Sequence, residues 1–535
     1  MWQQNYTPVA GTLGWSALVA AIPIFVLLYL LGVRRRPAWI AALSGLAAAA
    51  AVAVFAYGMP LKTLLGAVTF GAAFGLFPIC WIVFWAIVLY RITVDTGNFE
   101  VLKDSIGGLT EDRRLQALLT AFAFGAFIEG AAGFGAPVAV AAAMLAGLGF
   151  SPFYAAGICL LANTAPVAFG SIGTPILTLA GVTGLPLQAL SSWVGRICAP
   201  VSVIVPLYLM SVMGGWKAIK GVLPAALACG VSFAATQLFV SNFIGPQLTD
   251  ILSSLAAIGT LVVLFKLWKP KDDFHLEGEH QAHTVTRHPA AKVARAWMPY
   301  FLLVVFVLLW GMDAVKKPLD AATIKIAWPG LHNVVERVPP VVPKTSPYPA
   351  VFSLNWLTAS GTACLGAVLV AAAWLRLRPA QFAKAVATSL RQLAFSILTI
   401  ASVLALAFLM NYSGATATLG LAFAATGFLF PFFSAMLGWL GVFLTGSDTS
   451  ANALFGNLQV VTATRLGLDP VLMAASNSSG GVMGKMISLQ SIAVAAAATQ
   501  MPSGDESRLF RFTLRHSVIL AVVIALIVVL YSALL

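Results

Sequence analysis

The chain has 535 residues, of which 60% are hydrophobic and only 9% are charged. A water-soluble domain of this size would carry far more charge on its surface, so the composition excludes one and indicates a multi-pass membrane protein. The net charge of +13 is the excess of 31 Lys and Arg residues over 18 Asp and Glu residues. The Lys and Arg residues fall in short clusters between apolar runs. Such clusters are typical of the loops that set the orientation of a membrane protein, and do not indicate a nucleic-acid-binding surface.

The first three apolar runs predict three helices at the N-terminal end. The run Trp15–Val33 is followed directly by Arg34, Arg35 and Arg36, and no charged residue precedes these arginines. A cleavable signal peptide has its positive charge in front of the apolar run, so we expect a retained first helix with an external N-terminus. Two further runs follow at 38–57 and 64–89, and a proline predicts a kink in the second of them.

The segment Leu118–Phe150 is expected to form a re-entrant hairpin. Two apolar arms flank the sequence GAAGFGAP, and each arm of about a dozen residues is too short to cross roughly 30 Å of hydrocarbon. Small, flexible residues favour a turn at Gly130–Pro137. The next run, Phe153–Ala168, continues into FGSIGTP at Phe169–Pro175. Two glycines and a proline there predict a helix that unwinds within the membrane.

Further apolar runs bring the expected total to about 12–14 membrane crossings. The sequence HLEGEHQAH at His275–His283 matches no known metal-ligand spacing, so we expect a solvated loop there rather than a metal site. The proline-rich segment Asp313–Pro349 is expected to be external and to separate two halves of the chain. The crossings expected on both sides of this segment are Leu187–Met210, Val222–Val240, Ile251–Trp268, Met298–Met312, Leu354–Leu375 and Leu393–Met410.

The second half repeats the first in outline. Two short arms, Phe433–Leu444 and Ala453–Thr464, flank TGSDTSAN, and SNSSGGVMGKMIS at Ser476–Ser488 predicts a second broken helix. The motif FIEG, which begins at Phe127, aligns with FLTG, which begins at Phe443, at an offset of 443 − 127 = 316 residues. The motif ANT, centred on Asn163, aligns with SNS, centred on Asn477, at an offset of 477 − 163 = 314 residues. Hairpins and broken helices that meet near the midplane are a transporter architecture.

One point about this repeat stays open. An inverted repeat requires the two hairpins to enter the membrane from opposite sides. Counting the apolar run Thr416–Phe430 as a crossing puts both hairpins on the same side. Either this run does not span the membrane or an earlier crossing is miscounted.

Of the 18 acidic residues, we place only Glu129 and Asp448 inside predicted membrane segments. Intramembrane carboxyls mark proton and ion pathways, so we expect both to couple proton movement to transport. Alternatively, each carboxylate accepts hydrogen bonds from backbone N–H groups of its own turn and shapes the hairpin tip. Lys485 and Arg196 are the embedded cations, and an anionic substrate would supply a partner. Arg196 has the alternatives of pairing with Glu129 or reaching the membrane surface.

Polar and glycine residues gather around the predicted hairpin tips and broken helices. Some must satisfy the interrupted backbone, and others can bind the carboxylate and hydroxyl of a small hydroxy acid. The expected substrate-binding residues are Gly133, Asn163, Thr164, Ser171, Thr174, Arg196, Thr445, Ser447, Thr449, Ser450, Asn452, Ser476, Asn477, Ser478, Ser479, Gly480, Gly481 and Lys485.

Five stretches resemble the lactate permease family: WLGVFLTGSDTSANALFGNLQ, SSGGVMGKMISLQSIAVA, GAFIEGAAGFGAP, SNFIGPQL and the opening WQQNY. The resemblance implies proton-coupled uptake of L-lactate and related 2-hydroxymonocarboxylates such as glycolate across a bacterial inner membrane. It also implies a place in the larger ion transporter superfamily, whose members resemble dimers with a scaffold and a moving transport domain. The chain departs from the family pattern at Leu489, where proline is expected, which implies a straighter second broken helix.

The sequence therefore predicts an all-α polytopic membrane protein with two repeats, each with a re-entrant hairpin and a broken helix. We divide it into N-terminal helices (1–114), a first hairpin and broken-helix repeat (115–212), connecting helices and loops (213–350), and a second such repeat (351–535). The expected partners are a monocarboxylate anion, protons, membrane lipid and, as a candidate assembly, a second copy of the chain.

Other function classes were weighed against secondary transport. A dicarboxylate carrier is disfavoured because only two embedded cations are visible, and an anion channel stays open because broken helices also build pores. An intramembrane protease would require two membrane aspartates or an HExxH pair, neither of which we find. No GxxxxGK[ST] motif supports transport driven by ATP. We expect no enzyme activity, no cofactor and no metal.

Overall fold

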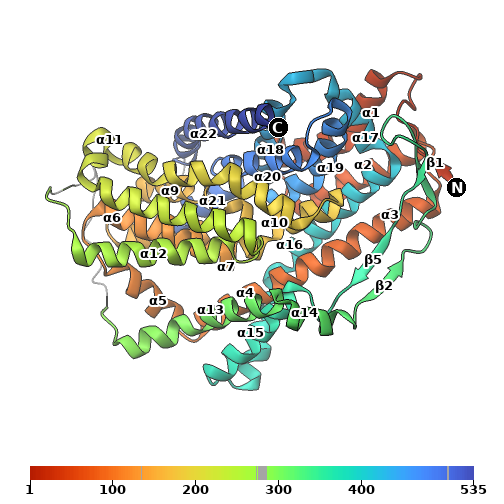
Figure 1. Cartoon of the computed structure of the whole chain (residues 1–535). Helices are drawn as coiled ribbons and strands as arrows, with labels where there is room; N and C mark the ends of the chain where they lie inside the picture. Colours follow the sequence, from red (N-terminus) through yellow and green to blue (C-terminus); the bar gives the residue numbers. More distant parts are fainter. Residues whose placement is uncertain (134, 273, 275–285, 503–504) are drawn as a thin grey trace.

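The structure is a computed structural model that describes residues 1–133, 135–272, 274, 286–502 and 505–535. Within these ranges the protein is mostly helical (Figure 1), as the sequence predicts. The loop at His275–His283, for which no metal site is expected, lies outside the described residues. Among the described residues, ten helices are long and apolar enough to cross a membrane, or eleven when one bent pair counts as a span.

The N-terminal helices lie where the apolar runs predict them. The helix α3 continues through a short π-helical stretch, η2, into α4, and the whole rod covers 35 residues. Its backbone is extended at Phe77 (φ −140°, ψ 124°), directly before Pro78. A residue before proline avoids the helical region, so the predicted kink is confirmed. The elements are α1 (Leu13–Leu28), η1 (Tyr29–Val33), α2 (Ala38–Phe55), α3 (Leu61–Phe74), η2 (Gly75–Cys80), α4 (Trp81–Asp95) and α5 (Asn98–Gly107).

The first hairpin and the interrupted helix after it are both present. The tip contains Gly133 and Gly135 with positive φ, and it joins α7 to α8. The next two helices, α9 and α10, meet at an angle of 66°. This break begins at 163–166, earlier than predicted, and continues through left-handed residues at 171–173. The elements are α6 (Arg113–Gln116), η3 (Ala117–Phe124), α7 (Gly125–Ala131), α8 (Ala136–Gly147), α9 (Pro152–Ala162), η4 (Val167–Phe169) and α10 (Gly170–Thr183).

Fewer helices than the predicted 12–14 qualify as spans, partly because α11 (Leu187–Phe243) joins two of them. Gly215 interrupts this helix with φ +61°. The Ser191 hydroxyl donates to the main-chain oxygen of Ser241 at 2.8 Å. Fifty residues of straight helix would separate these two positions by about 75 Å, so α11 doubles back. The predicted crossings Leu187–Met210 and Val222–Val240 are its two arms.

In the second half, α17 is only nine residues long, about 14 Å at 1.5 Å per residue, and is too short to cross the membrane by itself. It continues through η5 into α18, and the whole stretch Ala415–Thr445 counts as one candidate span of 31 residues. The side from which the second hairpin enters the membrane stays open, and the repeat itself stays a prediction. The elements are α16 (Pro379–Ser413), α17 (Ala415–Phe423), η5 (Ala424–Leu429), α18 (Phe430–Thr445), α19 (Asp448–Leu466), α20 (Pro470–Lys485), α21 (Leu489–Ala498) and α22 (Glu506–Leu534).

The second broken helix was predicted to unwind within Ser476–Ser488, a stretch that contains Gly480 and Gly481; at these two glycines the prediction is wrong. The helix α20 runs unbroken to Lys485, and the interruption follows at 486–488. The glycines instead let α18 approach closely: a Cβ at Gly480 would overlap the main chain of Ala435, and one at Gly484 would overlap that of Trp439. The stretch Pro470–Ala498 is long and apolar enough to count as one membrane span of 29 residues. The interrupted helix of the first half, in contrast, is bent by 66°.

Two small sheets were not foreseen. The strand β1 pairs in parallel with β3, which pairs with β4, and β2 pairs antiparallel with β5. They lie at one end of the helices together with the N-terminus (Figure 1). Leu354, where the crossing Leu354–Leu375 was predicted to begin, is the last residue of β5, and the helix α15 begins only at Ser360. The elements are β1 (Trp2–Gln3), β2 (Ile324–Ala327), β3 (Val335–Arg337), β4 (Ser346–Pro347), β5 (Val351–Leu354), α12 (Thr249–Leu267), α13 (Ala290–Gly311), α14 (Asp313–Asp320) and α15 (Ser360–Trp374).

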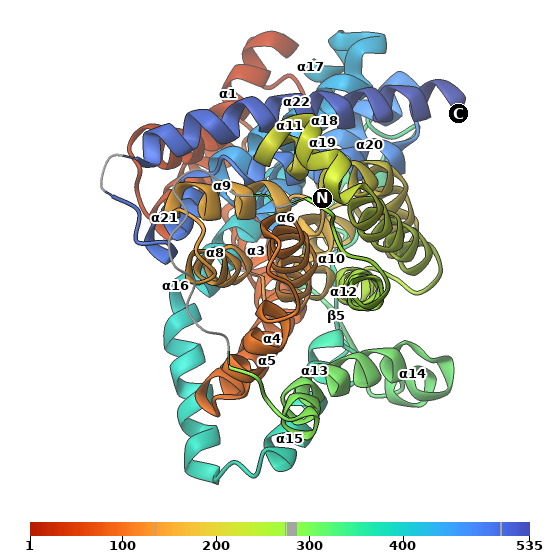
Figure 2. The same ribbon diagram turned by 90° about the vertical axis from the view of Figure 1, so that its left-hand side faces the viewer.

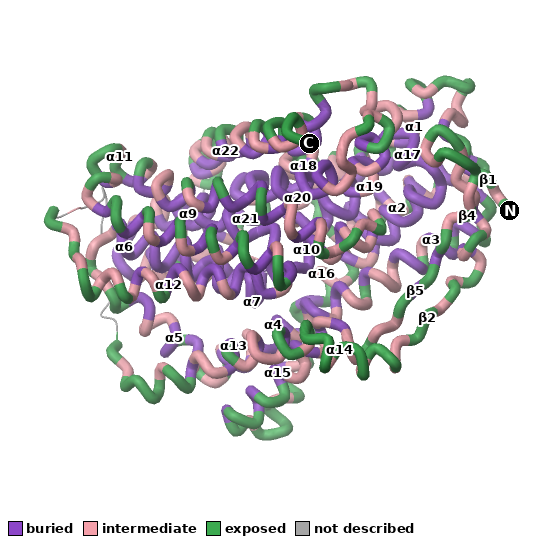
Figure 3. Tube along the Cα trace, in the orientation of Figure 1, coloured by how far each residue is buried: buried purple, intermediate pink, exposed green. Residues whose placement is uncertain are grey.

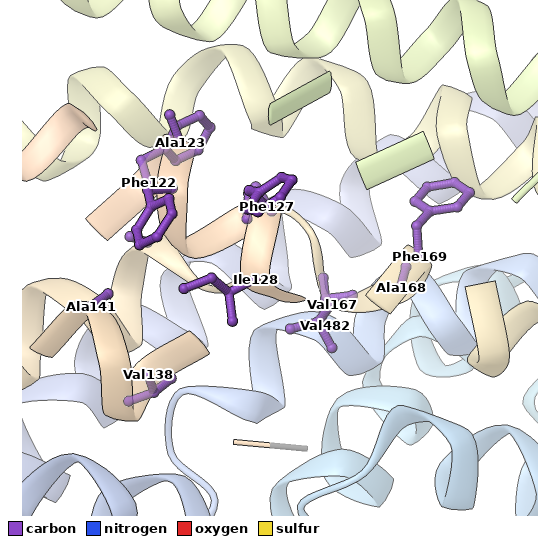
Figure 4. Packing of buried hydrophobic residues seen from close by; sticks show 14 of the residues in the cluster. Phe122, Ala123, Phe127, Ile128, Val138, Ala141, Val167, Ala168, Phe169 and Val482 are labelled. Atoms are coloured by element: carbon purple, nitrogen blue, oxygen red, sulfur yellow. The ribbon is translucent and has the colours of Figure 1, made fainter. Parts of the chain in front are cut away.

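Buried residues concentrate where the two halves meet. Figure 3 shows α7, α10 and α20 largely buried and the outer helices exposed, while Figure 2 shows α13 and α15 side by side at the edge. The larger hydrophobic cluster joins α7 of the first half to α20 of the second. In Figure 4, Val482 of α20 lies beside Val167 of η4. The interrupted helices of both halves therefore share one core.

Candidate functional site

The second hairpin places Asp448 at the start of a helix inside the protein. Gly446 (φ +71°) and Ser447 form the tip, and the Ser447 hydroxyl accepts a hydrogen bond from the Ser450 N–H at 3.2 Å. Asp448 follows as the first residue of α19 and is 3% exposed. The Ser478 hydroxyl donates to its Oδ2 at 2.5 Å. Its Oδ1 has no hydrogen-bond partner among the described residues.

Glu129 occupies the corresponding region of the first half. It lies in α7, is 6% exposed, and its Oε2 has no hydrogen-bond partner within the described part of the chain. A Cβ on Gly170 would come within 2.6 Å of its Oε1, so the start of α10 lies against the carboxyl. None of the hydrogen bonds found between described residues joins the carboxyl of Glu129 or Asp448 to a backbone N–H of its own turn; Asp448 Oδ2 accepts from the side chains of Asn452 and Ser478. These contacts therefore do not support the alternative in which the two carboxylates shape the hairpin tips.

Lys485 brings a cation to the same place. As the last residue of α20, it donates from Nζ to the main-chain oxygen of Gly446 at 2.6 Å. It is close enough to Glu129 and Asp448 for their charges to act on it. An ammonium group has three donors, and this one bond leaves capacity for an anionic ligand.

These three ionisable residues line one small cavity. Its volume is about 120 Å³, well above the roughly 10–15 Å³ that one water needs. Hydroxyl groups supply most of the remaining polar lining, which suits a small anion that carries a hydroxyl group. The lining comprises Ala38, Glu129, Val167, Gly170, Ser171, Pro175, Ser396, Thr399, Ile400, Thr445, Gly446, Ser447, Asp448, Thr449, Ser450, Lys485 and Gln490.

Several expected substrate-binding residues lie beside this cavity rather than on it. Asn452 donates to the main-chain oxygen of Pro175 at 3.2 Å and accepts from Asn477 at 2.9 Å, joining the two halves. Others bond main-chain oxygens of their own helix, the second role expected for such groups. The expected residues outside the lining are Gly133, Asn163, Thr164, Thr174, Arg196, Asn452, Ser476, Asn477, Ser478, Ser479, Gly480 and Gly481.

Arg196 is not brought to the cavity. It lies on the exposed side of α11, where its Nε donates to Asn242 Oδ1 at 3.0 Å and its guanidinium lies 5.2 Å from the Trp193 ring. It does not pair with Glu129. Lys485 is thus the only Lys or Arg among the described residues that line the cavity.

Sequence analysis missed the contribution of α16 and α21. Ser396 and Thr399 line the cavity from the middle of α16, and Gln490 lines it from the start of α21. The spacing of three residues between the first two puts them on one helix face. In the sequence, two hydroxyl residues at this spacing within an apolar run could have indicated that α16 contributes to the cavity.

A larger cavity adjoins the first. It has a volume of about 1720 Å³ and lies between α1, α18, α21 and α22. The two cavities share Ala38, Thr445, Gly446 and Gln490. Arg35, Arg36, Glu506 and Arg511 also line the larger cavity, so its charged lining is mainly basic.

Comparison with known proteins settles the family. A family model described as L-lactate permease matches residues 16–535. The chain belongs to the L-lactate permease family. It is 46% identical to the L-lactate permease of Bacillus subtilis over 98% of this chain and 97% of that protein. It is 45% identical to the glycolate permease GlcA of Escherichia coli over 99% of this chain and 98% of that protein.

The fold of this L-lactate permease family member also has a solved counterpart. The structure of Neisseria gonorrhoeae MtrF, described as illuminating a class of antimetabolite efflux pumps, aligns with a TM-score of 0.51 at 14% identity. The alignment covers 95% of this chain and 97% of that one, and at this identity it shows the fold alone. Family membership and the apolar helices make the chain a multi-pass membrane transporter of a small molecule, not an enzyme.

Proposed function

We propose that this family member couples proton entry to the uptake of L-lactate and related 2-hydroxymonocarboxylates such as glycolate. The observation that carries the proposal is the shared lining of Glu129, Asp448 and Lys485 around one buried cavity. The names of the relatives, L-lactate permease and glycolate permease, support the substrate class.

Charge balance around the cavity favours cotransport. With both carboxyls ionised, Glu129, Asp448 and Lys485 sum to −1, which repels an anion. Two added protons change the sum to +1, and one bound monocarboxylate then brings it to zero. Proton binding therefore favours anion binding, and by reciprocity anion binding favours proton binding.

The single cation also selects for one carboxylate. A second carboxylate on the substrate would lack a cationic partner at the cavity, and an unpaired charge away from water is costly. The hydroxyls of Ser171, Ser396 and Thr399, which line the cavity, can act as partners for the substrate hydroxyl. A dicarboxylate carrier is accordingly the weaker candidate.

The orientation we propose is an N-terminus outside a bacterial inner membrane. When the crossings are counted from an external N-terminus, three basic clusters fall on the inner side of the membrane. They are Arg34–Arg36, Lys217 with Lys220, and Arg376 with Arg378. This distribution follows the positive-inside rule. The larger cavity, bordered by Arg35 and Arg36, would then connect the site to the cytoplasm.

The test is uptake of labelled L-lactate into proteoliposomes with an imposed pH gradient, acid outside. We expect accumulation above the external concentration, collapse of the accumulation by a protonophore, and competition by glycolate but not by succinate. Accumulation that does not depend on the pH gradient would overturn proton coupling.

Counterflow separates a carrier from a channel. Proteoliposomes preloaded with unlabelled lactate should transiently concentrate labelled lactate against its gradient, because a carrier exchanges one substrate for another. A channel would give no such overshoot and would contradict the proposal.

A further inference from the structure

A third buried carboxyl, Asp250, lies outside the lining of the cavity. It is in the first turn of α12 and is 1% exposed. Both of its carboxyl oxygens are buried without a hydrogen-bond partner in the described ranges of the chain. An ionised carboxylate without a partner in such a place is costly, so the side chain calls for an explanation.

Asp250 lies directly behind the first hairpin. A Cβ on Gly130 would come within 2.8 Å of the Asp250 Cβ, so no side chain separates α7 from α12 there. Gly130 follows Glu129 in the chain, so Asp250 packs against the backbone position next to Glu129. The glycine thus keeps the two acidic residues near one another.

The elements that pack around Asp250 contribute few other titratable groups. The helix α7 supplies Glu129 and α11 supplies Cys198, whose thiol lies near both Asp250 and Asp448. The neighbouring η3 and α10 contain no titratable residue. None of the ion pairs between described residues involves Asp250.

A common structural role does not account for this residue. Acidic residues are frequent in the first turn of a helix, where they accept hydrogen bonds from free N–H groups. Neither oxygen of Asp250 accepts such a bond within the described part of the chain. Its position behind Glu129, rather than helix capping, is the feature that distinguishes it.

We propose that Asp250 is a second proton carrier directly behind the first hairpin and exchanges the coupling proton with Glu129. The proton leaves the Asp250 carboxylic acid for the Glu129 carboxylate, and the reverse transfer restores both groups, so no other reactant is needed. This inference rests on the proposed proton coupling.

The test compares Asp250→Asn with wild type in proteoliposomes. We expect accumulation of lactate driven by the pH gradient to fall at least tenfold, while counterflow stays within about twofold, because exchange needs no net proton transfer. Ser253→Ala is the matched control. Ser253 is one turn further along α12 and is buried, and its only hydrogen-bond partner among the described residues is the main-chain oxygen of Thr249, so both activities should be unchanged.

Asp250→Glu covers the case in which the amide variant does not reach the membrane. Asp250→Glu keeps a titratable group, so this variant should still accumulate lactate. The pH dependence of its net uptake should shift, whereas the pH dependence of exchange should stay unchanged. Accumulation like wild type in Asp250→Asn, or an unshifted profile in Asp250→Glu, would overturn this inference alone. Failure of wild-type protein to accumulate lactate would overturn the proposed function instead.

Discussion

Gly481 offers the sharpest test of how the second carboxyl is held. A Cβ at this position would lie 2.5 Å from Asp448 Oδ1 and 2.7 Å from a methyl group of Val442. Ordinary contact begins at 3.4 Å, so Gly481→Ala must displace the carboxyl by about 0.9 Å, the difference of the two distances. Overpacking of this kind costs about 1–3 kcal/mol, and displacement of a reacting group by about 1 Å can reduce a rate about 100-fold.

We therefore expect Gly481→Ala to insert normally, to lose about 1–3 kcal/mol of stability, and to take up lactate about 100-fold more slowly. Gly481→Val should abolish uptake. The assay is initial uptake in proteoliposomes, with thermal unfolding in detergent measured alongside. Gly259→Ala is the control, since nothing lies within 4 Å of its added methyl group. Uptake by Gly481→Ala at the wild-type rate would refute the close contact between α20 and Asp448.

Lys485→Met should weaken lactate binding, measured by calorimetry, about 10- to 150-fold, because one charge-assisted hydrogen bond is lost. The variant should stay monodisperse in detergent, and an unchanged affinity would show that Lys485 does not bind the substrate. Glu129→Gln should retain counterflow but lose accumulation driven by the pH gradient, and retained accumulation would exclude it as a coupling group. Asp448→Asn should reduce uptake strongly, whereas normal uptake at normal abundance would make Asp448 structural. Outside the membrane, hydrogen bonds from Arg114 hold the pKa of Asp272 below its usual value. That stabilisation is present above about pH 4 and is lost progressively as pH falls through the lowered pKa, so Asp272→Asn should lower the unfolding temperature at pH 7, and its difference from wild type should shrink as the pH falls below about 4.

The sequence located the polar interruptions because glycine and serine are conspicuous among apolar runs. It misjudged what the glycines of α20 do. A glycine in a membrane helix either opens the backbone or admits a neighbouring helix, and only the position of α18 decides between them. The left-handed backbone at Ser171–Gly173, by contrast, lies within the predicted interruption of the first half.

Asp250 and Arg196 show where reasoning from one segment stops. Asp250 follows a proline near the start of an apolar run, so it was assigned to a segment end, and only packing against Gly130 reveals that it is buried. Arg196 was expected to be embedded because apolar residues surround it in the chain. Its direction around α11, towards Asn242 and Trp193, depends on where the second arm of that helix lies.

The central claim is that the cavity moves a proton together with each monocarboxylate. The most direct measurement is the internal pH of proteoliposomes, reported by a trapped fluorescent dye, after addition of an inward L-lactate gradient at equal pH on both sides. We predict internal acidification in step with lactate entry, above the slow leak of protein-free liposomes, and its loss in Glu129→Gln. Entry of labelled lactate through the wild-type protein without acidification would contradict the account.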